Sequence, residues 1–208
     1  PERGGLTWRE FLSRHADVLL CADLFTKEIW TSCGLQRAFV LVVMHVRSRT
    51  ILLAEATFSP HAGWMAQQVR NVLWECGDLG VRPCFLIHDR DKCFCADFDA
   101  TLRSAGVKPV HTPYHAPNAN AFAERWIRSI RVECLNHLVL IGLESLRRVA
   151  TLYCRHFNDS RPHQGLANRV PRDVRTSVPA PEAIFGPVGE VHCEESLGGL
   201  LKSYRRAA

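Results

Sequence analysis

Three acidic residues stand in local settings that metal-assisted phosphate chemistry requires. Asp23 directly follows the apolar run 18–22, and Asp89 directly follows a second run of this kind, 84–88. Glu124 lies near the start of a stretch with helical periodicity. Hard ions such as Mg²⁺ and Mn²⁺ prefer oxygen ligands, whereas zinc sites are usually built from His and Cys. Two Asp and one Glu therefore predict a Mg²⁺ or Mn²⁺ site.

Such a site could cleave or transfer a phosphodiester. Two divalent ions about 3.5–4 Å apart, bridged by carboxylates, activate the attacking oxygen and neutralise the leaving oxygen. We expect Asp23 to bridge both ions, and Asp89 and Glu124 to complete one ion each. The protein then needs no general base of its own, because a metal-bound water or hydroxyl serves as the nucleophile.

Each acid also has a simpler interpretation. Asp89 and Asp91 could stabilise a turn through side-chain hydrogen bonds to the backbone. Glu124 could pair with Arg128, four residues further along a helix. Asp23 could be an ordinary residue at the end of a strand. The three acids in their local contexts together favour the metal site over these alternatives.

Bulk properties bound the class of protein. The chain has 208 residues, 47% of them hydrophobic and 23% charged, which suits a soluble domain with one sizeable core. No apolar run approaches the roughly 18 residues of a membrane-spanning helix, so we expect no membrane partner and a cytoplasmic location. The net charge of +5 fits a polyanionic partner such as DNA. The nine cysteines lack Cys-x-x-Cys spacing, which favours reduced thiols over a zinc finger or a disulfide framework.

Hydrophobic periodicity predicts the elements that must position these acids. We expect strands over 18–24, 38–46, 50–57, 84–88 and 108–111, and helices over 62–76, 97–104, 120–140 and 143–157. Hairpin-like early strands followed by a helix and further strands favour an α/β fold with a mixed sheet flanked by helices. We divide the chain into an N-terminal lead-in (1–16), a core (17–170) and a C-terminal extension (171–208) that we expect to be loosely ordered.

Four segments, in this order, carry a resemblance to a known family. They are 20–26 around Asp23, 87–94 around Asp89, the proline-containing segment 112–125 that leads to Glu124, and 157–166 with its Arg-Pro-His sequence. Over Leu6 to Pro171 the chain resembles the catalytic core of retroviral integrases and of bacterial insertion-sequence transposases, the DDE transposase/integrase superfamily. The resemblance implies a ribonuclease-H-like fold, with a five-stranded mixed sheet flanked by helices.

The resemblance also implies an activity, which is divalent-metal-dependent 3′-end cleavage and strand transfer of DNA. Asp23, Asp89 and Glu124 would be the catalytic residues and the ligands of two Mg²⁺ (or Mn²⁺) ions per active site. The DNA partners would be element ends and target. We expect a homodimer or a higher oligomer, because joining two DNA ends needs more than one active site. A bacterial mobile element, associated with the nucleoid, is the expected source.

Candidate DNA contacts lie around the third acid. Arg125, Arg128 and Arg131 follow Glu124 on the same predicted helix and could bind phosphates, although a plain solvated face would have the same composition. His115 and Asn118 lie in the loop before this helix, where the family places a mobile flap over the substrate. They could contact DNA or have no role in binding.

The sequence also departs from the family pattern. Arg90-Asp91 replaces the commoner Asn-Gly or Arg-Gly after the second acid, and Asp91 could compete for the metal. We expect end recognition to reside outside this chain, because no helix-turn-helix or zinc-binding region precedes the core. Two other functions stay open: a catalytically inactive, domesticated DNA-binding or assembly module, and a ribonuclease-H-like nuclease without transfer activity. The nuclease family carries a fourth acid on its first helix, and 62–76 offers only Glu75.

Overall fold

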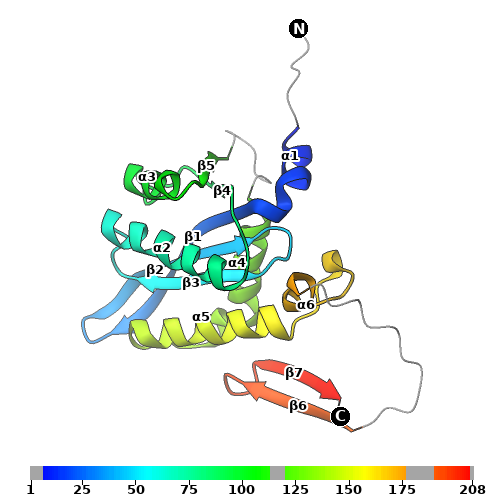
Figure 1. Ribbon diagram of the computed structural model, residues 1–208. Helices are drawn as coiled ribbons and strands as arrows, with labels where there is room; N and C mark the ends of the chain where they lie inside the picture. Colours follow the sequence, from blue (N-terminus) through cyan, green and yellow to red (C-terminus); the bar gives the residue numbers. More distant parts are fainter. Residues whose placement is uncertain (1–6, 113–119, 177–189, 207–208) are drawn as a thin grey trace.

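The computed structural model describes residues 7–112, 120–176 and 190–206. A five-stranded sheet with the order β3-β2-β1-β4-β5 lies at its centre (Figure 1). Its strands are β1 (Leu19–Thr31), β2 (Gly34–His45), β3 (Ile51–Thr57), β4 (Phe85–His88) and β5 (Lys108–His111). β1 pairs antiparallel with β2, and β2 with β3, whereas β1-β4 and β4-β5 are parallel pairs. The predicted five-stranded mixed sheet is confirmed.

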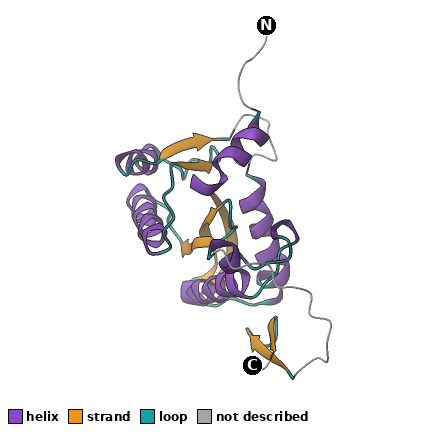
Figure 2. Ribbon diagram, turned by 45° about the vertical axis from the view of Figure 1, so that its right-hand side comes forward, coloured by secondary structure: helices purple, strands orange, loops and turns teal. Residues whose placement is uncertain are grey.

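Helices cover both faces of this sheet. They are α1 (Trp8–His15), α2 (Ala62–Asp78), α3 (Ala96–Ser104), α4 (Ala121–Glu133), α5 (Gly142–Asp159) and α6 (Pro171–Arg175). The pair α2 and α3 packs on one face and the pair α4 and α5 on the other, as the two views show (Figures 1 and 2). None of the helices in the described ranges is long and apolar enough to span a membrane.

Side chains along β1 alternate between these two layers. Cys21 and Phe25 belong to the core formed with α4 and α5, and Leu20 and Ala22 belong to the core formed with α2 and α3. Because successive residues of a strand point to opposite faces, Asp23 shares the face of Cys21 and Phe25. The alternation of the strand therefore directs this carboxyl toward α4.

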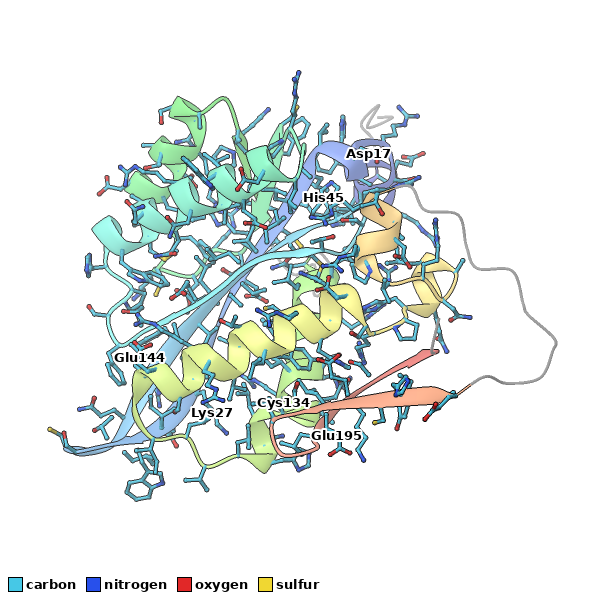
Figure 3. All side chains as sticks on the ribbon, turned by 60° about the horizontal axis from the view of Figure 1, so that its bottom comes forward. Asp17, Lys27, His45, Cys134, Glu144 and Glu195 are labelled. Atoms are coloured by element: carbon cyan, nitrogen blue, oxygen red, sulfur yellow. The ribbon has the colours of Figure 1, made fainter. Side chains whose placement is uncertain are left out.

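The two largest differences from the sequence-based prediction are the ends of β1 and α4. β1 continues to Thr31, so Asp23 lies inside a strand and not at its end; the antiparallel partner β2 pairs with it as far as Thr31↔Gly34. The helix predicted over 120–140 ends at Glu133. Lys27 Nζ donates to the carbonyl oxygen of Leu135 at 2.9 Å, close to Cys134 at the end of α4 (Figure 3), which stabilises the turn that follows.

A β-hairpin of β6 (Val191–Ser196) and β7 (Leu201–Arg206) was not anticipated from the sequence. Its turn contains Gly198 and Gly199 at φ 68° and 88°, a backbone conformation that glycine adopts without strain. Leu201 is 4% exposed and belongs to the core on the α5 side of the sheet. The hairpin thus contributes a buried side chain to the same layer as α4 and α5.

Candidate active site

The register between β1 and β4 brings two of the predicted acids to neighbouring positions. Cys21 of β1 is the partner of Ile87 of β4, and the two strands run parallel. Asp23 and Asp89 each lie two residues beyond this pair, and the charge of Asp89 acts on the Asp23 carboxyl. Strand pairing ends at Cys21↔Ile87, and Asp89 is the first residue after β4. The pairing of β1 with β4 therefore ends just before Asp23 and Asp89, where a ligand could bind between the two carboxylates.

Glu124 reaches this place because α4 is anchored on β1. The side-chain amide of Asn120, which is 5% exposed, donates to the carbonyl oxygen of Ala22 at 2.8 Å. One turn into the helix, the Trp126 ring packs edge-on against Phe25, with 6.4 Å between ring centroids. Sequence reasoning missed Asn120, although an Asn at the start of a predicted helix suggests a capping role. Here its side chain fixes the helix to the strand that carries Asp23.

Asp23 and Glu124 line one pocket of about 430 Å³, between β1 and α4. Its other lining residues are Leu24, Phe25, Ile127, Arg128, Arg131, Val132 and Asn136. Asp23 is half-buried and Glu124 is exposed, so the pocket offers one carboxylate at its wall and one at its rim. The structure thus brings together two acids that are far apart in the sequence.

The charges of the three acids act on one another. Burial raises the pKa of the Asp23 carboxyl to about 7; the Leu24 N–H, which donates to its Oδ1 at 2.8 Å, opposes this rise. The negative charges of Asp89, Glu124 and Asp91 raise the pKa further. A divalent cation would relieve both the repulsion and the desolvation. An all-oxygen, mutually repelling set of carboxylates therefore fits Mg²⁺ or Mn²⁺.

In the loop after β4, two carboxylates accept hydrogen bonds from the backbone. The backbone N–H of Asp91 donates to Asp89 Oδ1 at 3.0 Å, and that of Cys93 donates to Asp91 Oδ1 at 2.8 Å. These are the turn-forming hydrogen bonds considered for the simpler interpretation. They orient the Asp89 carboxylate through one oxygen, so its other oxygen can bind an ion.

The three predicted arginines of α4 separate into two groups. Arg128 and Arg131 line the pocket with Glu124, and the Arg131 guanidinium lies over the Phe25 ring, 5.3 Å from its centroid. Arg125 instead lines a different cavity, together with Arg49. Arg128 and Arg131 follow Glu124 by four and seven residues and therefore share its face of the helix, whereas Arg125 follows it by one residue and is turned about 100° away from it. His115 and Asn118 lie outside the described residues.

The end of α5 is tied to α4 by a polar bridge. Glu133 accepts from the Tyr153 hydroxyl at 2.7 Å and from Arg161 at 2.5 Å. Arg161 also lies over the Phe157 ring, 5.6 Å from its centroid. Arg161 of the Arg-Pro-His segment thus supports the helix that carries Glu124.

Two alternative locations do not match the predicted set of acids. Glu75 lies on α2, which covers the opposite face of the sheet from α4, so it cannot serve as a fourth acid beside Asp23. A larger cavity of about 630 Å³ lies at the other end of β1, where Asp17 and His45 are labelled in Figure 3. The one carboxylate in its lining, Asp17, is 3.5 Å from Arg47. That cavity therefore lacks a set of metal-binding acids.

We expect Asp23→Asn to stabilise the metal-free protein at pH 8 by roughly 2 kcal/mol. The pKa of Asp23 rises on folding from 3.8 to about 7. Between these values the folded state keeps a proton that the unfolded chain has lost, so wild-type stability falls as the pH rises through this window. Asn removes this cost. Urea unfolding in the presence of EDTA, at pH 4 and pH 8, measures the difference.

The advantage of the variant should be present at pH 8 and largely absent at pH 4. An equal effect at both pH values would mean that ionisation of Asp23 is not the cause. Asp97→Asn, on the exposed start of α3, removes one carboxylate elsewhere and serves as the control.

Comparisons with known proteins show similarity to integrase cores and to transposases. The family model described as integrase core domain matches residues 105–171. A putative transposase InsD for insertion element IS2E of Escherichia coli (strain K12) is 26% identical over 98 residues. These residues make up 46% of this chain and 44% of that transposase, so the match spans less than half of the relative's length.

Solved structures show the same fold. The catalytic core domain of BIV integrase aligns with a TM-score of 0.54 at 15% identity, over 77% of this chain and 95% of that one. The HTLV-2 integrase catalytic core domain in complex with magnesium aligns with a TM-score of 0.54 at 11% identity, over 76% and 96% of the two chains. The ribonuclease-H-like fold is therefore confirmed, and the chain is similar to integrase cores and to the transposase of an insertion element.

Proposed function

We propose that this protein is the catalytic core of a DNA transposase that cleaves 3′ ends and transfers them to target DNA. Asp23, Asp89 and Glu124 would hold two Mg²⁺ or Mn²⁺ ions between β1 and α4. The observation that carries the proposal is the pocket shared by Asp23 and Glu124. The negative charge of Asp89 also raises the pKa of Asp23. Bound ions would activate the attacking oxygen and stabilise charge on the leaving oxygen.

The residues of the chain would perform the remaining tasks. Asp23 presents its carboxylate from a rigid strand, so its position depends little on loop motion. Glu124, exposed at the rim, can meet the DNA backbone together with an ion. Arg128 and Arg131 share its face of α4 and can bind the phosphates on either side of the reacting one. The apolar wall formed by Phe25 and Ile127 would limit access of bulk water.

Assembly of two or more copies is part of the proposal. Strand transfer joins two DNA ends, so one active site per complex is insufficient. The similar HTLV-2 integrase core is described in a trimeric form, and the InsD relative is described as the transposase of an insertion element. We expect light scattering to show a dimer or larger assembly of this protein on DNA. A strict monomer on DNA would contradict this part.

Joining of a labelled oligonucleotide to plasmid DNA tests the function. The protein is incubated with Mg²⁺ or Mn²⁺, a supercoiled plasmid and a duplex with a free 3′-hydroxyl. Products that contain both the label and the plasmid show strand transfer. Nicked plasmid without joined label would indicate a nuclease, and DNA binding without either product would indicate a binding module.

We expect Arg128→Glu to weaken DNA binding about tenfold at moderate salt and to lower the slope of log affinity against log salt by about 1. Arg128 lines the pocket beside Glu124, so reversal of its charge places a second negative group near the phosphates. Fluorescence anisotropy with a short duplex, measured at several salt concentrations, gives both quantities.

Arg148→Glu provides the matched control. Arg148 is exposed on α5, away from the pocket lining, and the substitution changes the net charge of the protein by the same amount. If both variants weaken binding equally, the effect comes from net charge and not from a phosphate contact at Arg128.

A further inference from the structure

A second cluster of potential metal ligands lies behind β4, on the other face of the sheet. It consists of His88 at the end of β4, Asp99 on α3 and His111 at the end of β5. One ligand atom from each residue lies within 4.8 Å of the other two. His88 is 0% and Asp99 7% exposed, whereas the His111 side chain is 39% exposed. The cluster is therefore buried on two sides and open to solvent on the third.

The hydrogen bonds of His88 favour a positive charge at this place. Its Nδ1 is 2.7 Å from the carbonyl oxygen of Asp89, which can only accept, so Nδ1 carries a proton. Its Nε2 is 3.0 Å from Asp99 Oδ1. A neutral imidazole has one N–H, so its Nε2 lone pair then faces a carboxylate oxygen. A positive charge makes this contact favourable, either as a proton on Nε2, which turns His88 into an imidazolium, or as a bound metal ion.

The tautomer is the one found in metal sites. A histidine that binds a metal through one ring nitrogen commonly donates the other N–H to a backbone carbonyl or a carboxylate. His88 has this arrangement, because the N–H of Nδ1 is directed to the Asp89 carbonyl oxygen. Nε2 is thereby left as the ligand atom.

The distances between the ligand atoms suit a small ion. Asp99 Oδ2 lies 3.3 Å from His111 Nε2, and Asp99 Oδ1 lies 3.0 Å from His88 Nε2. Ligands bound at about 2.0–2.1 Å in tetrahedral geometry are about 3.3 Å apart. The two observed distances, each to a different oxygen of Asp99, are therefore close to those between ligands of one small ion.

The basic side chain of Arg103 also contacts the cluster. Arg103 donates to Asp99 Oδ2 at 3.1 Å from the next turn of α3. Its side chain is 59% exposed, so it can turn toward solvent when an ion binds. Because His111 is exposed, an ion can reach the cluster from solvent.

We propose that His88, Asp99 and His111 form a second metal site, which binds a transition-metal ion of the Zn²⁺ class. Two imidazole nitrogens and one carboxylate suit Zn²⁺ and similar ions, whereas Mg²⁺ prefers oxygen ligands alone. The site is distinct from the carboxylate pocket, and its existence does not depend on the proposed transposase activity. A bound ion would join the ends of β4 and β5 to α3, beside the segment that carries Asp89.

Cobalt titration tests this proposal. Protein without an affinity tag is freed of metal and titrated with Co²⁺, and visible absorption records ions held by nitrogen and oxygen ligands. We expect one equivalent to saturate the signal and Zn²⁺, but not millimolar Mg²⁺, to displace it. Asp99→Asn and His111→Ala should each weaken binding at least about tenfold. His192→Ala, which removes an exposed histidine of β6, should bind as the wild type does.

Each outcome decides the question. No saturable signal in the wild type would mean that His88 is an imidazolium between two oxygen acceptors and that the cluster is an ion-pair network. Equal binding by all four proteins would place the ion elsewhere, and a strong near-ultraviolet charge-transfer band would identify cysteine thiolates as its ligands. Glu124→Gln should retain the cobalt signal, which separates this site from the carboxylate pocket. His111→Ala alters an exposed side chain, so it remains informative if Asp99→Asn does not fold.

Discussion

Glu124→Gln is expected to lower the rate of strand transfer by about 10³-fold, which corresponds to about 4 kcal/mol of transition-state stabilisation. Gln has the same shape as Glu but no negative charge, so an ion at the rim of the pocket would lose a charged ligand. The side chain is exposed, and the helix contacts the sheet through other residues, so the fold should be unchanged. Joining of labelled DNA with Mg²⁺ measures the rate, and circular dichroism checks the fold.

Glu144→Gln is the matched control. Glu144 also lies in the first turn of a helix, α5, where it pairs with Arg147 and its side chain is 83% exposed (Figure 3). This variant should transfer strands at the wild-type rate. Wild-type activity in Glu124→Gln would remove Glu124 from the proposed active site, and with it the assignment of the pocket. Equal losses in both variants would indicate a general effect of charge on DNA binding.

Trp126→Ala is expected to lower the free energy of unfolding by about 4 kcal/mol. Trp126 is 1% exposed and packs between β1 and α5. Its ring lies 5.8 Å from that of Tyr153 and 6.4 Å from those of Phe25 and Phe157, measured between centroids. Ala would leave a large cavity under α4. Urea unfolding followed by circular dichroism gives the difference.

Trp126→Phe should cost far less, about 1–2 kcal/mol. Phe keeps most of the ring contacts and also removes the indole N–H, which is buried without a hydrogen-bond partner in the described part of the chain. Trp74→Ala on α2 is the control, because Trp74 is 75% exposed and its loss should change stability by no more than about 0.5 kcal/mol. A small cost for Trp126→Ala would mean that α4 is not held on the sheet by this side chain.

Stability and activity are linked through α4. Trp126 is two residues from Glu124, so the packing that stabilises the fold also positions the proposed ligand. Asn120 and the Glu133–Arg161 ion pair fix the two ends of the same helix. We therefore expect Trp126→Phe, which folds, to retain most of the activity, and any loss to appear in the rate constant and not in DNA affinity.

Much of the fold could be predicted because it follows from local periodicity. The strand 108–111 has the predicted bounds, and the helices that begin near 62 and 143 lie within two residues of their predicted starts and ends. The layers of the sheet follow from the alternation along β1, which needs no knowledge of distant residues. The same holds for α4, where Ala123, Trp126 and Ile130 form the buried stripe and Glu124 lies outside it.

The ends of helices and strands that are set by contacts with other segments could not be predicted from local patterns. β1 extends beyond Leu24 because β2 pairs with it, and α4 ends at Glu133 where Lys27 binds the carbonyl oxygen of Leu135. The hairpin of β6 and β7 places Leu201 in the core, although the composition around it is that of an extension. β2 directly follows β1 in the chain, whereas the contacts of Leu135 and Leu201 come from segments remote in the sequence.

The amino-acid sequence by itself identified the three acids. Its periodicity also determined which face of β1 bears Asp23 and which face of α4 bears Glu124. Only the tertiary structure decided that Asp23 and Asp89 lie two residues beyond paired positions of β1 and β4, that Arg125 lines a cavity with Arg49, and that His88, Asp99 and His111 meet. The periodicity of a segment states which side chains point the same way. Which segments lie side by side, and in which register, depends on packing and hydrogen bonds between parts of the chain that no local pattern records.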